Sequence, residues 1–492
     1  MRRTRLLSVS KNGDSAMSIS PSSNTAGNDW AKFAAIPLLL AFVNFSIGGE
    51  FEGMSEPAAL GEGPARHADQ PAATDGTAAA GDCWQEYDDP YGNSPCNGEY
   101  RTNCSPGLMD EFAAMSKCMA SQGIVYNVVV PQFYQGVTHG GRDEGFEYGG
   151  KVDQFITLDG GKLWGAEGFS IATHVETRYG DDVNLDAVGF APANVAMLYP
   201  KEGEHDTAIT GLLFDQALDQ DLHVTFGKYN GLDMFYALYP QTGRGVNTFM
   251  NASMVIPLSV ARVVPLSFMG VGLTKYQDKK AQSGVMVFDN QDVTTTSGFD
   301  DMFDNGANIM GYYRFFTEVG GLPGSHMFGG IWATGDYVSF DPLSFVILPG
   351  EGVVFDRQSG AYTLLYILEQ TLWVDRCDKN RNIGLLSQWG LADQETSPIS
   401  WSCNVAIQAQ GLNRQRPQDS IGVGYFHTAL SDTFKQQLSP AFDLRDVDGV
   451  EMYYNAAVTK CFQLTADLQV IEPADATNDT AVVFGLRGTV GL

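Results

Sequence analysis

The sequence predicts an all-β fold, a transmembrane antiparallel β-barrel with a short N-terminal helix. Glycine is abundant, with 55 residues among 492, aromatic residues reach 11% and charged residues only 18%. This composition suits many short strands joined by turns better than a helix-rich cytosolic enzyme. Apolar and polar residues also alternate along segments of about ten residues, long enough for a tilted strand to cross a bilayer. Aromatic residues near the ends of these segments are the third indication.

The first 49 residues predict a secretory signal peptide. Arg2, Arg3 and Arg5 lead into a polar stretch, and residues 33–49 carry no charge. A basic lead followed by a short apolar core that ends in small residues is the pattern of an export signal. Because the polar lead is long, Met17 is an alternative start. Residues 50–82, rich in Ala, Gly, Glu, Pro and Asp, predict a flexible linker.

Residues 83–121 form a cysteine-containing segment that ends in the predicted helix. Four of the seven cysteines lie close together here, and export favours two disulfides among them, with three pairings open: Cys83, Cys96, Cys104 and Cys118. Their spacing lacks the close pairs of zinc sites, so we expect no metal. Leu108, Phe112 and Met115 share one face of a helix expected over residues 106–121. We expect this segment to be periplasmic or to plug the barrel.

From residue 122 to residue 492 the hydrophobic period changes to two, which predicts the barrel itself. Asp467 and Gln469, for example, alternate with Leu464, Leu468 and Val470. Similar segments predict strands at 169–179, 222–229, 308–317, 362–373, 382–391, 401–410, 420–430 and 482–492. Turn signals separate the segments at 181–182, 230–231, 304–306, 378–380 and 448–449.

Alternation alone does not separate a membrane barrel from a soluble β-sandwich, because both bury one face of each strand. The aromatic residues favour the barrel. They stand near the segment ends, where girdles would lie at the membrane interfaces: Tyr179, Tyr229, Trp373, Trp389, Trp401, Tyr425 and Tyr453.

Short motifs occur in order between residues 106 and 492, at 134–137, 147–150, 176–180, 243–251, 261–265, 416–424, 451–455, 467–473 and 484–487. Together they resemble the carbohydrate-selective porins of the OprB type. The resemblance implies a 16-stranded outer-membrane barrel whose long loops fold inward, and through which small, glucose-like saccharides diffuse without energy input. It also implies two partners, outer-membrane lipid and the barrel-assembly machinery. The final Leu492 departs from the family's usual aromatic end, as does the cysteine-rich segment.

A sugar-selective constriction needs charged or amide groups beside aromatic rings, and the implied pore offers candidates. Glu176 and Arg178 share one strand face that we expect to point inward. Arg244 and Asn251 lie in a stretch rich in Gly and Asn that we expect to form an inward loop. Further candidates are Asp233, Arg262 and Arg314. Arginine is apt because its planar fork pairs two hydroxyls. The alternative is that these charges brace the barrel wall.

The net charge of −28 repels phosphate groups, so we expect no nucleic-acid partner. The acidity either keeps the loops soluble or gives the channel mouth a negative potential. A general, weakly cation-selective porin is therefore an alternative function.

A secreted β-rich glycan hydrolase is an alternative from another class, since two carboxylates across a cleft suffice for that chemistry. However, the sequence has no HExxH, GxSxG, P-loop or GxGxxG motif, and its seven histidines lack ligand spacing. Acidic residues at 300–306 and 446–449 do not fit a calcium loop. We therefore expect no enzyme activity, catalytic residue or cofactor. A structural barrel with a plugged lumen is a third alternative.

Overall fold

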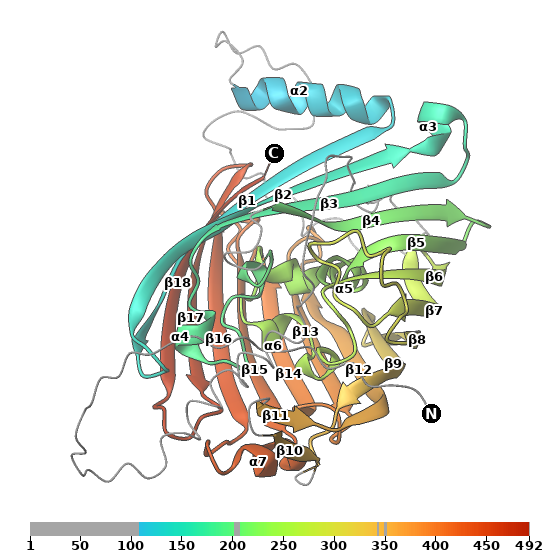
Figure 1. Cartoon of the computed structure of the whole chain (residues 1–492). Coiled ribbons are helices and arrows are strands. Elements are labelled where there is room, and N and C mark those ends of the chain that lie inside the picture. The colour runs from blue at the N-terminus through green and yellow to red at the C-terminus, as the bar shows by residue number, and fades with distance from the viewer. Residues whose placement is uncertain (1–107, 201–206, 342–343, 349–351, 492) are drawn as a thin grey trace, which may run out of the picture.

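The computed structural model describes residues 108–491 apart from 201–206, 342–343 and 349–351. The expected signal peptide at 1–49, the linker at 50–82 and Cys83, Cys96 and Cys104 lie outside the described residues. Sixteen antiparallel strands close into one barrel (Figure 1), and β1 pairs with both β2 and β18. The predicted fold class is confirmed. In the part of the chain described, no helix is long and apolar enough to span a membrane.

The first half of the barrel runs from β1 to β9: β1 Ile124–His139, β2 Gly145–Asp159, β3 Phe169–Gly180, β4 Thr207–Ala217, β5 Leu222–Asn230, β6 Ser267–Gln277, β7 Lys280–Asp289, β8 Ala307–Val319 and β9 Leu322–Val338. The second half runs from β12 to β18: β12 Arg357–Val374, β13 Asn382–Ala392, β14 Ile399–Gln410, β15 Ser420–Leu430, β16 Val447–Ala457, β17 Phe462–Glu472 and β18 Ala481–Gly491. Each strand segment expected from the period-two pattern overlaps one of these strands.

Short helices and a small sheet complete the described elements: α2 Leu108–Ser121, α3 Gly160–Trp164, α4 Asn184–Ala187, α5 Gly231–Leu238, α6 Ala252–Val255 and α7 Asp432–Leu438, with the 3-10 helices η1 Val195–Met197, η2 Pro240–Gly245 and η3 Leu258–Val260. Strands β10 Phe345–Leu348 and β11 Gly352–Phe355 pair apart from the barrel. The helix expected at 106–121 is α2.

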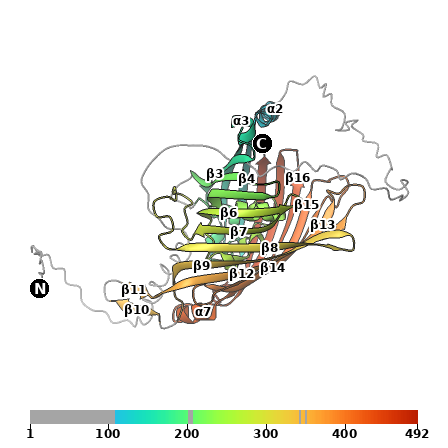
Figure 2. The same ribbon diagram turned by 90° about the vertical axis from the view of Figure 1, so that its right-hand side faces the viewer.

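The two ends of the barrel differ. At the end where β1 begins, here named the turn end, neighbouring strands are joined closely: β6 ends at Gln277 and β7 starts at Lys280. At the opposite, loop end, β5 stops at Asn230 and β6 starts only at Ser267. Figure 2 shows α2 and α3 at the turn end and α7 with β10 and β11 at the loop end. Short turns on one side and long loops on the other are typical of outer-membrane barrels.

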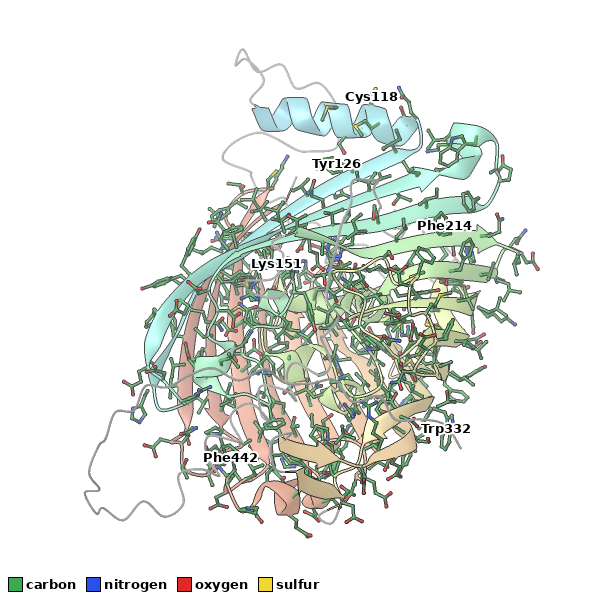
Figure 3. All side chains as sticks on the ribbon, in the orientation of Figure 1. Cys118, Tyr126, Lys151, Phe214, Trp332 and Phe442 are labelled. Carbon is green, nitrogen blue, oxygen red and sulfur yellow. The ribbon has the colours of Figure 1, made fainter. Side chains whose placement is uncertain are left out.

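The two faces of the wall have opposite polarity. On β17, Leu468 is 36% exposed, whereas its neighbours Asp467 and Gln469 are 1% and 0% exposed. Outward side chains elsewhere are mostly apolar, such as Trp332, which Figure 3 places on the outside of the barrel. Apolar residues outside and polar residues inside is the pattern of a barrel that lies in lipid.

The expected aromatic girdle is correct only in part. Trp389 and Trp401 lie exposed near the loop end with their rings stacked at 6.4 Å, and Tyr425 is exposed nearby. Tyr229 and Tyr453, in contrast, are buried, because they pack with phenylalanines inside the molecule: Tyr229 stacks on Phe268 and Tyr453 meets Phe249 edge-on.

Two further expectations are wrong. Asp448 and Gly449 do not form a turn but lie inside β16, where Gly449 leaves room for the Phe426 ring. Cys118 forms no disulfide; it is a free thiol exposed on α2, outside the barrel (Figure 3). Cys377, which the sequence left unassigned, is disulfide-bonded.

Two loops fold back from the loop end into the barrel. The first inward loop, residues 181–200, carries α4 and η1; the inward segment, residues 231–266, carries α5, η2, α6 and η3. Figure 1 shows α5 and α6 inside the ring of strands. Apolar side chains of both loops form the main core with the inner wall, among them Val195, Phe249, Met254, Val255, Leu258, Ala406, Phe426 and Tyr453. The core of this protein therefore fills the lumen.

Local sequence explains the shape of the inward segment. The Asn230 side chain accepts the backbone N–H groups of Leu232 and Asp233 and so starts α5. Gly243 and Arg244 adopt left-handed φ angles of 66° and 54°, which turn the chain within η2. The Asn251 side chain then accepts the Ser253 N–H at the start of α6. The two asparagines therefore start helices, and the Gly243–Arg244 turn changes the direction of the chain between them.

Candidate functional site

The inward segment is attached on one side to β16, β17 and β18. Glu451 accepts the backbone N–H groups of Met250 and Asn251, the latter at 3.0 Å. Arg487 donates to the carbonyl oxygens of Gly245 at 2.8 Å and of Thr248 at 3.0 Å. These buried polar groups would be costly without partners, so the bonds fix the path of the segment.

The same segment is attached to other parts of the wall. Asn404 of β14 donates to the Ser253 carbonyl at 2.6 Å, and Asn308 of β8 donates to the Val263 carbonyl at 2.6 Å. The inward segment therefore crosses the lumen from β8 to β18 and narrows it.

Three of the expected site residues belong to this structural frame. Asn251 is fully buried and donates to the Ala191 carbonyl at 3.2 Å. Arg262 donates to the Thr396 carbonyl at 2.8 Å, and burial lowers the pKa of Arg262 to about 10. Arg314 donates to the Leu238 carbonyl at 2.9 Å beneath the Tyr239 ring. For these residues, bracing of the lumen accounts for the contacts in the structure.

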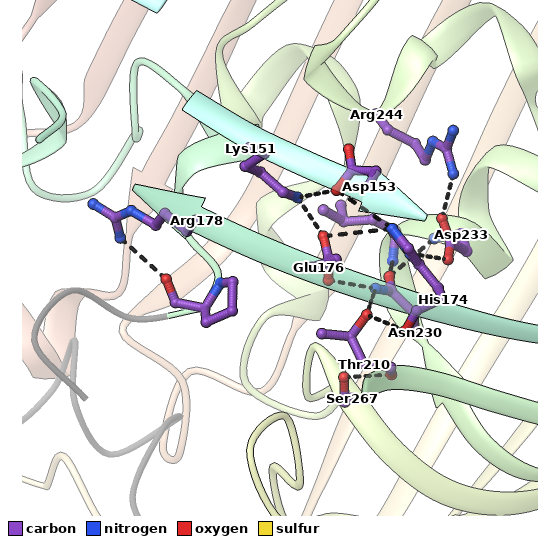
Figure 4. Close-up of polar contacts among 12 residues, drawn as sticks. Lys151, Asp153, His174, Glu176, Arg178, Thr210, Asn230, Asp233, Arg244 and Ser267 are labelled. Carbon is purple, nitrogen blue, oxygen red and sulfur yellow. Dashed lines mark hydrogen bonds and ion pairs between the residues drawn. The ribbon is translucent and has the colours of Figure 1, made fainter. Parts of the chain in front are cut away.

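Charged side chains from the wall and the inward segment meet in one group, here named the charge cluster: Lys151 and Asp153 of β2, His174 and Glu176 of β3, Asp233 of α5 and Arg244 of η2 (Figure 4). The Lys151 ammonium lies 3.2 Å from Asp153 Oδ1 and also contacts Glu176. Lys151, Asp153, His174 and Glu176 are each about 95% buried.

Asp233 and Arg244 form the part of the charge cluster that faces open space. Their Oδ1 and Nη1 atoms lie 2.7 Å apart, and the two side chains are 27% and 18% exposed. The Arg244 guanidinium lies over the Phe155 and Tyr236 rings, at 4.5 and 4.7 Å from the centroids. Burial alone would raise the pKa of Asp233, but the His174 and Arg244 charges outweigh it and hold that pKa below its ordinary value. The pair is therefore ionised.

A small pocket lies beside the charge cluster. Lys151, Glu176, Asn230 and Thr210 contribute its polar lining. Asn230 donates to Glu176 at 3.2 Å and to Thr210 at 2.9 Å. Hydroxyl and amide groups thus continue the polar surface next to the charges (Figure 4).

Of the seven expected site residues, the structure brings together Glu176, Asp233 and Arg244. Arg178 shares the inward face of β3 with Glu176, as expected, but it pairs with Asp182 at 2.5 Å instead. The sequence argument missed Lys151, Asp153 and His174. Their signal was present in two strand motifs, Lys-Val-Asp at 151–153 and His-Val-Glu at 174–176, which place two ionisable groups on one strand face.

Asp153, His174 and Glu176 could in principle hold a metal ion, since their ligand atoms lie within 4.8 Å of one another. However, the Lys151 ammonium already contacts both carboxylates. This ammonium supplies the positive charge that a metal would bring, so the cluster resembles an ion-pair network more than a metal centre.

A sequence profile of the carbohydrate-selective porin, OprB family matches residues 143–492, which is most of the chain. The chain belongs to this family. It is therefore an outer-membrane β-barrel that passes carbohydrates. No curated protein matches the porin in sequence.

Solved structures support the fold of the porin. The high-pH structure of Pseudomonas putida OprB is 18% identical, has a TM-score of 0.68 and covers 80% of this chain and 100% of its own. The low-pH structure of the same protein is 14% identical, with a TM-score of 0.50 and coverage of 79% and 99%. Both agree with the 16-stranded barrel.

Proposed function

We propose that glucose-like saccharides cross the porin by passive diffusion past the charge cluster, and that Arg244 and Asp233 exchange hydrogen bonds with their hydroxyl groups. The observation that carries this proposal is the exposure of two side chains of the charge cluster to the lumen. Arg244 and Asp233 are 18% and 27% exposed, whereas Lys151 and Glu176 are almost fully buried. Glu176 therefore supports the site from behind rather than touching the sugar.

The geometry around Arg244 suits a weak sugar site. The guanidinium offers donors in a fixed plane, the Asp233 carboxylate offers acceptors, and the Tyr236 ring offers an apolar face. Arg244 already contacts both Asp233 and the Tyr236 ring, so a sugar replaces existing contacts instead of filling empty ones. Such exchange keeps binding weak, which passage through a pore requires.

The family and fold are those of a channel, and we propose that the porin carries out no reaction. Asp153 and Glu176, the two wall carboxylates of the charge cluster, both contact Lys151. A glycan hydrolase needs one protonated and one free carboxyl group on opposite sides of a sugar. Two carboxylates held by one ammonium do not provide that arrangement.

We also propose the partners that surround the porin in the cell. The exposed apolar band would lie in outer-membrane lipid, with the turn end in the periplasm. The barrel-assembly machinery would insert the chain.

Liposome swelling tests the proposed function. Wild-type porin should admit glucose and maltose faster than a zwitterionic amino acid of similar size, and Arg244→Gln should reduce this preference severalfold. Arg142→Gln, which removes the same charge from an exposed turn, is the matched control. Equal rates for all solutes would instead indicate a general porin, and inserted protein without swelling a plugged barrel.

A further inference from the structure

We infer that His174 is the positioning residue of the constriction: it fastens α5 to the barrel wall and supplies the positive charge that balances the charge cluster, so that the ion selectivity of the pore depends on pH. This inference rests on the proposed function, since it concerns the same site. It goes further by assigning a role to a residue that touches no sugar in that proposal.

Both ring nitrogens of His174 lie close to carboxylates. His174 Nδ1 lies 2.7 Å from Asp233 Oδ2, and Nε2 lies 3.4 Å from Asp153 Oδ1 and 3.9 Å from Glu176 Oε1. A neutral imidazole donates from one nitrogen only, whereas the imidazolium donates from both. Nδ1 hydrogen-bonds to Asp233, whereas Nε2 makes no hydrogen bond within the described part of the chain but lies within ion-pair distance of both wall carboxylates. A positive charge on the ring is therefore stabilised from both sides.

Charged side chains from four elements surround the His174 ring. Lys151 and Asp153 approach from β2, Glu176 from β3 itself, and Asp233 from α5 with Arg244 of η2 behind it. The Phe155 ring stacks on the imidazole with centroids 4.1 Å apart. His174 therefore stands between the two carboxylates of the wall and the ion pair of the inward segment, and it joins them.

Helix α5 is packed less tightly than α6, the other helix of the inward segment. No residue of α5 is buried, in contrast to α6, where all four are. The α6 half of the inward segment also has bonds to Glu451 and Asn404. Arg314 of β8 holds the other end of α5 through the Leu238 carbonyl. Loss of the His174–Asp233 contact would therefore loosen the first turn of α5 and the Asp233–Arg244 pair while the rest of the segment stays in place.

The net charge of the charge cluster depends on whether His174 is protonated. The cluster contains three carboxylates and two cations that stay charged over the ordinary pH range, Lys151 and Arg244. A charged His174 brings the sum to zero, and a neutral His174 leaves one negative charge. Because Asp233 is partly exposed to the lumen, that charge acts on passing ions and favours cations.

Reversal potentials in a KCl gradient across planar bilayers, from about pH 5 to about pH 10, test the inference, because histidine is the group that changes charge most readily in this range. Wild-type porin should become more cation-selective as the pH rises, by about threefold in the permeability ratio. His174→Gln, which keeps hydrogen-bonding ability without charge, should show the high-pH selectivity throughout. His174→Arg, which keeps the charge, should show the low-pH selectivity throughout.

His223→Gln is the matched control. His223 also pairs with a carboxylate, Asp215, with Nδ1 and Oδ1 2.9 Å apart, but both residues belong to the wall strands β4 and β5. This variant should keep the wild-type pH dependence. If His174→Gln and His174→Arg keep it too, the inference is overturned; should His174→Gln not insert, the comparison of wild type with His174→Arg decides. No sugar is present, so this outcome is independent of the swelling experiment.

Discussion

The Glu451 side chain on β16 accepts the backbone N–H of Asn251, 200 residues earlier in the chain, at 3.0 Å. Both residues are fully buried. The bond joins the wall to the middle of the inward segment. The width of the lumen therefore depends on a side chain that points inward from a wall strand distant in the sequence.

Replacement of Glu451 should widen and destabilise the pore. Glu451→Ala leaves the buried N–H groups of Met250 and Asn251 without an acceptor, at a cost of about 1–3 kcal/mol for each group. We expect a larger and noisier single-channel conductance and a lower unfolding temperature in detergent. Glu318→Ala, at an exposed position on β8, is the control and should match wild type. Unchanged conductance would mean that the remaining bonds hold the segment without Glu451.

Gly449 is the second position where one small change should have a large effect. A Cβ atom there would come within 2.2 Å of Phe426 Cζ, and Phe426 is fully buried in the core. Gly449→Ala should therefore lower the free energy of unfolding by about 1–3 kcal/mol. The double variant Gly449→Ala, Phe426→Leu should recover part of that loss, because the shorter side chain leaves the space free. Strictly additive losses would show that the two residues do not compete for the same volume.

The same two positions show what the sequence could and could not predict. The strands were predictable because the period of two is imposed by lipid on one side and polar lumen on the other. Gly449 was mistaken for a turn because Asp-Gly is a local turn signal, whereas the reason for this glycine is a ring on the neighbouring strand. Glu176 was found because its strand face was expected to point inward, and Arg244 because its stretch rich in Gly and Asn was expected to form an inward loop. His174 was missed because its meaning comes from Asp233, which only the fold of the inward segment brings near.

Thiol labelling should distinguish the cysteines of the folded porin. Cys118 is exposed on α2, whereas Cys403 is buried beside Trp401 and His427 on the outer wall. A maleimide should therefore modify Cys118 rapidly without denaturant and Cys403 only after unfolding. Cys461 is also free but only partly exposed, so it should react more slowly than Cys118. Cys118→Ser should therefore remove the fastest phase and leave the slower one. If wild-type protein shows no rapid phase, Cys118 is covered or oxidised in the folded protein.

Acid should leave the Asp233–Arg244 pair intact over an unusually wide range. Because the pKa of Asp233 is lowered in the folded protein, the stability that its ionised form contributes is fully present above about pH 4, and it is lost only as the pH falls through that lowered value. The preference for glucose over the amino acid should therefore stay constant from about pH 7 down to about pH 4.5. Asp233→Asn should reduce the preference equally at every pH in this window, since it removes the charge permanently.

Swelling rates of wild type and Asp233→Asn, measured at both ends of this pH window, check the prediction. Asp215→Asn, which breaks the wall pair with His223, is the control. A preference that already declines in wild type near pH 5 would mean that Asp233 titrates as an ordinary carboxyl group, and that the neighbouring cations do not hold it ionised.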